Sequence, residues 1–265
     1  MFKAAGVQNL TESQLFKASM LKAAGGESLL QNELLCSLSA EERARLSPSM
    51  QRVSLSLGRV LYEAGGRLDY AYFPISCLVS WVYTMQDGST AQTALVGNDG
   101  VAGIGLFLGR DTTPHRAVVQ IGGEAFKVAA RVLQMEFARG GPLQRAVLRY
   151  TQSLLTQISQ TAVCNRLHSI EQRLCRWLLV CDDRLKRSEI LMTQENIANM
   201  LGGRREGVTV AAGRLQDAGL IQYSRGHIKI LYRKGLEAIV CECYQTLEDE
   251  IEQLSYARAR SEVSR

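Results

Sequence analysis

The residues most suited to chemistry in this chain are two arginines that follow a glycine pair. Gly202-Gly203 precedes Arg204-Arg205, and apolar residues then recur at helical spacing. These apolar positions are Val208, Ala211, Ala212, Leu215 and Ala218. One face of the predicted helix therefore packs inward, and the opposite face begins with two guanidinium groups. Guanidinium donors pair bidentately with guanine in the major groove of DNA, so we expect this helix to read base edges.

The elements around these arginines predict a DNA-binding unit. A short helix over residues 193–201 precedes the glycine pair, and two helices joined by a glycine-containing turn are typical of a helix-turn-helix. Strand-like runs on both sides of residues 224–227 predict a β-hairpin, which makes the unit a winged helix-turn-helix. The tip of the wing carries Ser224, Arg225 and His227, whose donors suit phosphate contacts.

Charge is consistent with this interpretation without proving it. Residues 168–240 hold twelve Lys and Arg against eight Asp and Glu, a local net charge of +4 (12 − 8), and the whole chain carries +5. Such a balance permits a nucleic-acid partner but does not require one. The alternative therefore stays open that this is a ligand-sensing or protein-interaction module whose winged helix contacts a protein. An enzyme is disfavoured, because the three histidines are far apart in sequence and no glycine-rich phosphate loop or Ser/His/Asp signature is present.

Length and composition indicate an ordinary globular protein. The 265 residues are 46% apolar and 22% charged, which suggests about two domains with real cores. No run approaches the roughly 18 apolar residues of a membrane span. The N-terminus holds Glu12 and lacks the continuous apolar stretch of a signal peptide. We therefore expect a cytoplasmic protein with no membrane partner.

The seven cysteines are predicted to be structural or idle. An odd number in a chain of this type argues against a disulfide framework. Cys175 and Cys181 fall in the apolar pattern of a helix predicted from residue 168 to residue 185. Cys241 and Cys243 fall in another helix, predicted over residues 236–254, where side chains two positions apart point in different directions. We therefore expect no metal site, no redox site and no cofactor.

Periodicity divides the chain into five parts. Residues 1–28 show no sustained pattern and form a predicted flexible arm. Residues 29–140 contain short alternating strands separated by glycine turns, which predicts a small β barrel or sandwich. Residues 141–166 form a long amphipathic helix that begins at a proline. Residues 167–240 hold the winged helix-turn-helix, and residues 241–265 a C-terminal helix and tail.

The long helix is predicted to be a dimer seam. Its apolar residues recur at intervals of three and four, and the alternative is that they pack on the helix's own β domain. We favour the seam, because a paired DNA reader needs its two recognition helices about 34 Å apart. The predicted interface residues are Leu143, Val147, Tyr150, Leu154, Ile158 and Ala162.

The order of β domain, long helix and winged helix-turn-helix resembles the Crp/Fnr family of bacterial transcription regulators. Residues 70–104 look like the family's cyclic-nucleotide-binding β-roll. Residues 169–184 look like the opening helix of its DNA-binding domain, and residues 192–221 like its helix-turn-helix. The resemblance implies an α+β fold with a β-roll sensor domain and a homodimer that binds inverted-repeat double-stranded DNA. RNA polymerase is a candidate partner, and the effector ligand is unknown.

The resemblance also implies which residues contact DNA. The family's Arg-Glu pair at the start of the recognition helix falls on Arg205 and Glu206, which suit guanine and the cytosine amino group. A second base-contacting arginine would fall at Val210, so Arg204 and Thr209 become substitutes. Glu206 could instead stabilise the helix N-terminus, and Arg214 could be solvated or salt-bridged. The complete predicted set is Thr193, Arg204, Arg205, Glu206, Thr209, Arg214, Ser224, Arg225 and His227.

The predicted effector pocket departs from the family pattern. Gly103 stands where cyclic-nucleotide binders hold the ribose with a glutamate, and His115 and Arg116 stand where they hold the phosphate with an arginine followed by serine or threonine. Loss of this charge clamp costs several kcal/mol, so we expect cyclic AMP to bind weakly or not at all. The iron–sulfur branch of the family is also disfavoured, because Cys36 stands alone near the N-terminus.

Overall fold

The computed structural model describes residues 31–185 and 189–263. The arm predicted for residues 1–28 lies outside these ranges. The described chain begins with the short helices α2 (Glu33–Cys36) and α3 (Ala40–Leu46) and a 3-10 turn (Ser47–Ser49). The buried Asn32 side chain caps α2 by accepting from the Leu35 amide, and it donates to the carbonyls of Pro74 and Gly100. These hydrogen bonds tie the first helices to the β domain that follows.

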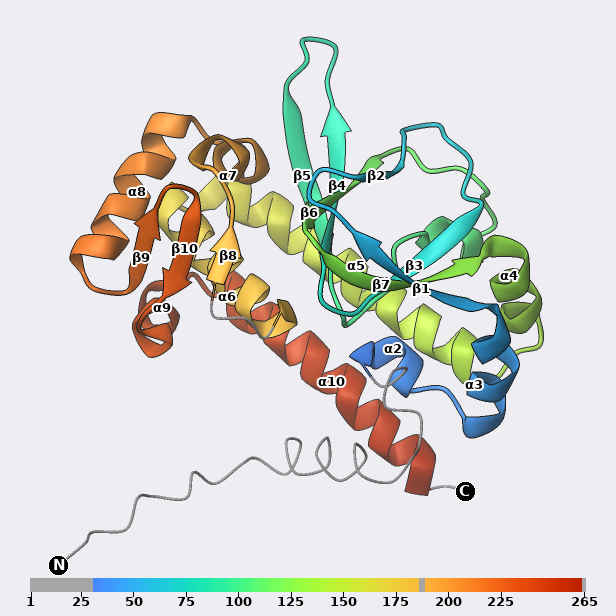
Figure 1. The fold of residues 1–265 in the computed structure, drawn as a ribbon. Coiled ribbons are helices and arrows are strands. Elements are labelled where there is room, and N and C mark those ends of the chain that lie inside the picture. The colour runs from blue at the N-terminus through green and yellow to red at the C-terminus, as the bar shows by residue number, and fades with distance from the viewer. Residues whose placement is uncertain (1–30, 186–188, 264–265) are drawn as a thin grey trace, which may run out of the picture.

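Seven strands form two antiparallel sheets in the N-terminal half (Figure 1). The first sheet has the strand order β1-β7-β3 and the second β2-β6-β4-β5. Phe73, Val79 and Val119 are completely buried between them. The strands are β1 (Met50–Leu55), β2 (Val60–Tyr62), β3 (Tyr70–Pro74), β4 (Leu78–Thr84), β5 (Thr90–Val96), β6 (Arg116–Ile121) and β7 (Gly123–Ala129), with a 3-10 turn over Ile104–Phe107. The predicted α+β class with an N-terminal β domain is confirmed.

Two helices follow the sheets, α4 (Ala130–Ala138) and the 26-residue α5 (Pro142–Leu167). The predicted choice of seam residues on α5 was wrong. Leu143, Val147, Tyr150 and Leu154 are at most 6% exposed and belong to the core of their own β domain, against which Ile158 is also packed. The periodicity therefore marked the side of the helix that the chain buries itself. Ala162 alone of the six predicted residues is exposed.

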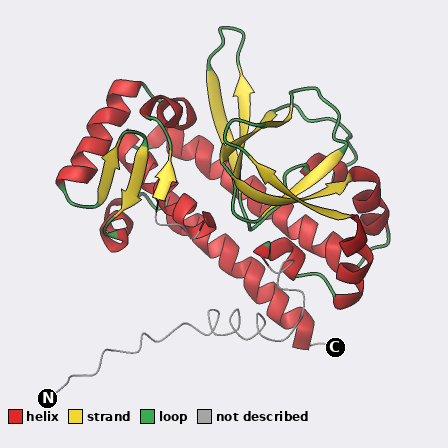
Figure 2. Cartoon of the chain, in the orientation of Figure 1, coloured by secondary structure: helices red, strands yellow, loops and turns green. Residues whose placement is uncertain are grey.

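The C-terminal half forms a second core around a small sheet of order β8-β10-β9 (Figure 2). The predicted wing is present as β9 and β10, and β8 is an additional strand that was not predicted. The elements are α6 (Ile170–Leu185), β8 (Glu189–Leu191), α7 (Gln194–Leu201), α8 (Arg205–Asp217), β9 (Ile221–Ser224), β10 (His227–Ile230), α9 (Arg233–Ile239) and α10 (Cys243–Val263). The predicted single helix over residues 236–254 is thus two helices.

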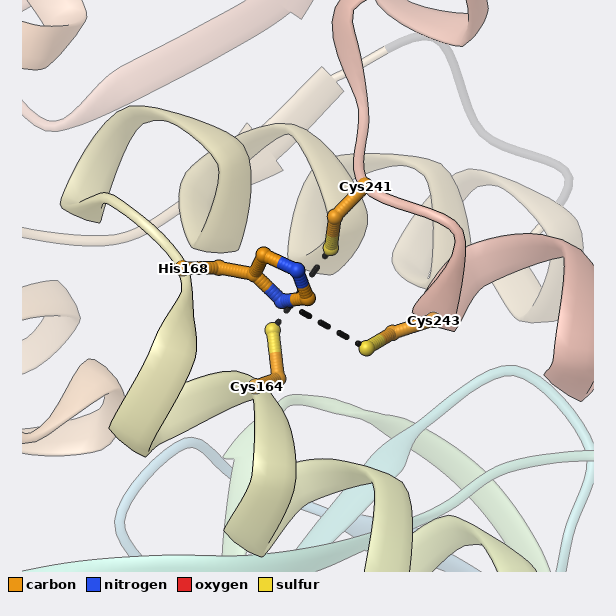
Figure 3. A group of neighbouring side chains, drawn as sticks. All are labelled: Cys164, His168, Cys241 and Cys243. Carbon is orange, nitrogen blue, oxygen red and sulfur yellow. Dashed lines mark hydrogen bonds between the residues drawn. The ribbon is translucent and has the colours of Figure 1, made fainter.

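This break corrects the prediction for Cys241 and Cys243. Cys241 lies in the link between α9 and α10, and Cys243 is the first residue of α10, so helical spacing does not separate them. Their sulfur atoms lie close to that of Cys164 and to the ring of His168, which gives a group able to hold a metal ion (Figure 3). The prediction that Cys241 and Cys243 suit no metal site was therefore wrong, because the two residues do not lie in one continuous helix.

The two halves pack against each other. Leu78, Leu95 and Ile121 of the β domain share an apolar cluster with the C-terminal helices. The Arg184 guanidinium of α6 forms a 2.7 Å ion pair with Asp99 and donates to the Leu95 carbonyl. The Arg184 and Asp99 side chains are only 8% and 16% exposed, so this ion pair is largely shielded from water.

Candidate nucleic-acid interface

Small residues set the angle between α7 and α8. The Thr193 hydroxyl caps α7 by accepting from the Asn196 amide at 3.2 Å. The helix ends at Gly202, whose φ of 60° lies in the left-handed region that glycine adopts without strain. A Cβ atom on Gly203 would lie 2.7 Å from Ile170 Cδ1, so a larger residue there would require the end of the Ile170 side chain to move. The glycine pair therefore fixes how the second helix leaves the first.

Helix α8 separates an inward face from a face open to solvent. Its inward face consists of Val208, Ala211, Ala212 and Leu215, which are at most 3% exposed. Arg204 is the N-cap residue, and Arg205 and Glu206 occupy the first turn. All three side chains are exposed. Within the described ranges, no ion pair engages Arg204 or Arg205, so both guanidinium groups are available to a partner.

The next turns of α8 extend this open face. Thr209 is exposed, and its hydroxyl donates to Gln194 Oε1 at 2.8 Å, which links α8 to the first turn of α7. Val210 is 54% exposed although it is apolar. The sequence analysis noted at position 210 only that an arginine is absent. Val210 lies four residues after Glu206, however, and therefore on the same face of α8, which the sequence could have shown. An apolar side chain there can contact the thymine methyl group.

Arg214 lies on the same helix but already has a partner. Its Nη1 atom is 3.4 Å from Glu171 Oε2 of α6, and the Arg214 side chain is 70% exposed. This is the salt-bridged arrangement that the sequence left open as an alternative. The ion pair is exposed, so it holds the guanidinium only weakly.

The wing projects its tip through a tight turn between β9 and β10. Arg225 has a φ of 49° and Gly226 a φ of 83°, the two positive values of a type I′ hairpin turn. Ser224, Arg225 and His227 are exposed, as the sequence led us to expect. His227 Nδ1, however, lies 2.8 Å from Glu189 Oε1 of β8. Arg225 is therefore the stronger candidate for a phosphate contact at this tip, because the Glu189 carboxylate competes with a phosphate for the His227 ring.

The position expected for the ribose-binding glutamate is filled by the β domain itself. Gly103 has a φ of 108°, and a Cβ atom there would lie 3.0 Å from the Tyr62 hydroxyl and 3.3 Å from Ala71. Burial raises the pKa of Tyr62, whose hydroxyl donates to the Tyr70 and Ala102 carbonyls. An acidic side chain at position 103 would be strained and crowded.

The two residues expected near the phosphate serve other contacts. The His115 ring stacks on Trp81 with 3.9 Å between ring centroids, and its Nε2 atom lies 3.0 Å from the Thr113 hydroxyl. Burial lowers the pKa of His115 to about 4, so the ring is neutral at physiological pH. Arg116 is exposed and pairs with Glu63 at 3.1 Å. A neutral buried imidazole and a surface ion pair do not form a phosphate clamp.

Comparison with known proteins connects this geometry to a family. The family described as the Crp-like helix-turn-helix domain matches residues 172–239, the part that contains most of α6, the helix-turn-helix, the wing and α9. No curated protein sequence matches the chain. None of the helices in the described part of the chain is both long and apolar enough to cross a membrane.

Solved structures share the fold of about 70% of this chain at low sequence identity. FixK2 from Bradyrhizobium japonicum is 18% identical with a TM-score of 0.63, over 72% of this chain and 98% of that protein. The c-di-GMP responsive global regulator CLP of Xanthomonas campestris is 18% identical with a TM-score of 0.59, over 72% and 99%. A CRP-family transcriptional regulator from Thermus thermophilus is 19% identical with a TM-score of 0.57, over 71% and 95%. The chain therefore carries a Crp-like helix-turn-helix domain and has the fold of the Crp/Fnr transcription regulators.

Proposed function

We propose that the protein is a homodimeric transcription regulator that reads an inverted-repeat operator through the first turns of α8. The observation that carries this proposal is the exposed pair Arg204 and Arg205 at the start of a helix whose other face is buried. Arg205 donates to a guanine and Glu206 accepts from a cytosine amino group. Val210 adds an apolar contact to a thymine methyl group, so the target differs from that of regulators with an arginine there.

Contacts to the DNA backbone surround this reading helix. Arg225 at the wing tip and Thr193 at the N-cap of α7 are both exposed. Such residues fix the register of a protein on the duplex without selecting its sequence. Thr209 orients α7 relative to α8 through its hydrogen bond to Gln194. When DNA binds, the Arg214 guanidinium leaves its ion pair with Glu171 and contacts a phosphate instead.

We place the dimer seam on the side of α5 that the β domain leaves uncovered. Leu148, Leu155 and Val163 are 50%, 55% and 45% exposed. Leu148, Leu155 and the exposed Ala162 are spaced seven residues apart, the repeat that lets two helices pack along one line. A symmetric dimer would bury this stripe against its own copy and leave both α8 helices open.

We further propose that cyclic AMP does not control this protein. A carboxylate-bearing residue at position 103 would be strained by the positive φ and crowded by Tyr62, and the His115 imidazole stacks on Trp81. Ribose and phosphate therefore lack the two charged partners that a cyclic nucleotide needs. Calorimetry with cyclic AMP should give no measurable heat of binding, and micromolar affinity would contradict this part of the proposal.

The proposal is tested by selecting bound sequences from a random duplex pool with ligand-free protein at two salt concentrations. Enrichment of a two-fold-symmetric site would support a dimeric sequence reader. Arg205→Ala protein should then lose its preference at one base pair of each half-site. Binding that shows no sequence enrichment at either salt concentration, or enrichment of an asymmetric site, would contradict the proposal.

A further inference from the structure

Three cysteines and one histidine from distant parts of the chain meet where the end of α5 lies next to the start of α10. Cys164 lies in the last turn of α5, and His168 is the C-cap residue of the same helix. Cys241 lies in the link before α10, and Cys243 begins α10. Figure 3 shows the four side chains pointing toward one another from these two segments. The ligand atoms all lie within 4.8 Å of one another.

Two of the six separations among the four ligand atoms lie close to those expected around one small cation. Zinc binds thiolate sulfur at about 2.3 Å and imidazole nitrogen at about 2.0–2.1 Å, so tetrahedral geometry places two sulfurs about 3.8 Å apart and a sulfur and a nitrogen about 3.6 Å apart. The Sγ atoms of Cys164 and Cys241 are 3.6 Å apart. Cys243 Sγ lies 3.5 Å from His168 Nδ1. The four ligand atoms are therefore already gathered within 4.8 Å of one another, and small movements would bring them to tetrahedral spacing.

Burial distinguishes this group from idle surface thiols. Cys164, Cys241 and Cys243 are 0%, 3% and 1% exposed and form an apolar cluster of their own, separate from the two main cores. Four protein ligands close a tetrahedral site, which is the arrangement of structural zinc rather than catalytic zinc. An iron–sulfur cluster spreads its four ligands over two or more iron atoms, which needs wider spacing than this group has.

The surroundings of the group suit a bound dication. His168 Nε2 lies 3.3 Å from Glu242 Oε1, which leaves Nδ1 facing the thiols. A carboxylate on the outer ring nitrogen is the usual way to orient a metal-bound histidine. Three thiolates around Zn²⁺ leave one net negative charge. The guanidinium of Arg176, itself 8% exposed, interacts electrostatically with Cys164 and Cys243 and offsets that charge.

We propose that Cys164, His168, Cys241 and Cys243 bind one structural Zn²⁺ ion. The thiolate-rich tetrahedral set selects zinc over calcium or magnesium, which prefer oxygen ligands. The ion fastens the end of α5 to the start of α10, at the point where the chain passes from α5 into the winged-helix domain through α6. It thereby holds the C-terminal helix against the base of the DNA-binding unit.

Metal analysis of the full-length protein purified under reducing conditions tests the site. We expect one zinc per chain by plasma mass spectrometry. Replacement of zinc by Co²⁺ should give thiolate charge-transfer bands and the strong visible bands of tetrahedral cobalt. Cys241→Ser and Cys243→Ser should abolish both signals, whereas the matched control Cys36→Ser, in α2, should keep them.

A milder variant separates binding from folding. Glu242 is 81% exposed, so Glu242→Gln should fold normally yet bind zinc about 10- to 100-fold more weakly in competition with a chromophoric chelator. An unchanged affinity would mean that Glu242 does not orient His168. Wild-type protein that takes up neither zinc nor cobalt after reduction would overturn the proposal. Recovery of iron with acid-labile sulfide, or a Cys164–Cys241 disulfide in freshly purified protein, would also overturn it.

Discussion

Leu155→Glu should separate the dimer while leaving each protomer folded. Leu155 is 55% exposed on α5, and the full burial of a leucine gains about 1.5–3 kcal/mol. Covering the exposed half therefore gains about 1 kcal/mol per protomer and about 2 kcal/mol in a symmetric dimer, where the residue occurs twice. Since about 1.4 kcal/mol is a factor of ten, losing these contacts weakens the dimer about 30-fold. Burying an unpaired glutamate carboxylate weakens it further.

Sedimentation equilibrium over a range of concentrations measures this change directly. Leu57→Glu is the matched control, because Leu57 is 56% exposed but lies in the turn after β1, away from α5. The control should keep the wild-type dissociation constant, and both variants should keep the wild-type midpoint of urea unfolding in the monomer range. Equal dimer affinity of Leu155→Glu and wild type would refute the seam proposed here. A monomeric wild type would refute it as well.

His115→Phe should flatten the acid dependence of stability. Burial lowers the pKa of His115 to about 4 in the folded protein, whereas a histidine in the unfolded chain has a pKa of about 6.5. The contribution of His115 to the free energy of unfolding is therefore fully present above about pH 6.5 and falls by about 2 kcal/mol by pH 5. Urea unfolding at pH 7.5 and pH 5 should show this loss of stability in the wild type but not in His115→Phe. Equal losses in the two proteins would contradict the prediction. Arg225→Asn should raise the free energy of unfolding by about 0.5–1 kcal/mol, because asparagine tolerates the positive φ, and should weaken binding to all DNA sequences alike. A destabilised variant would argue against strain at this turn. Asp99→Asn should cost about 3 kcal/mol, because it leaves Arg184 buried without a counter-charge; a change below about 1 kcal/mol in thermal or urea unfolding would show that the pair contributes little.

The DNA-binding unit could be predicted from sequence because its signals are local. Gly202-Gly203, the apolar spacing of α8 and the wing turn at Arg225 each act within a few residues. The buried face of α5 could not be assigned in this way, because helical spacing alone does not show whether an apolar face packs on its own domain or on a partner. Tyr150 and Leu155 both fit a helical pattern, and only the packing shows that the first is buried and the second exposed.

The metal-ligating group shows a different limit. Cys164 and His168 carry a helical i, i+4 spacing, but their partners lie more than seventy positions later in the chain. Apolar periodicity did not show the break between α9 and α10, which takes Cys241 out of the helix. The site forms because distant segments pack together and because a short link separates α9 from α10. The assumption of a continuous helix therefore gives the wrong direction for the side chains of two cysteines two positions apart.

The most direct test of the central claim compares Arg205→Ala and Arg225→Ala on specific and random duplexes over a range of salt. If α8 reads bases, Arg205→Ala should lose about 1–3 kcal/mol on the selected site and little on random DNA. Arg225→Ala should weaken both duplexes alike and lower the salt dependence by about one ion. Equal losses on both duplexes for Arg205→Ala would contradict the account of α8 as the recognition helix.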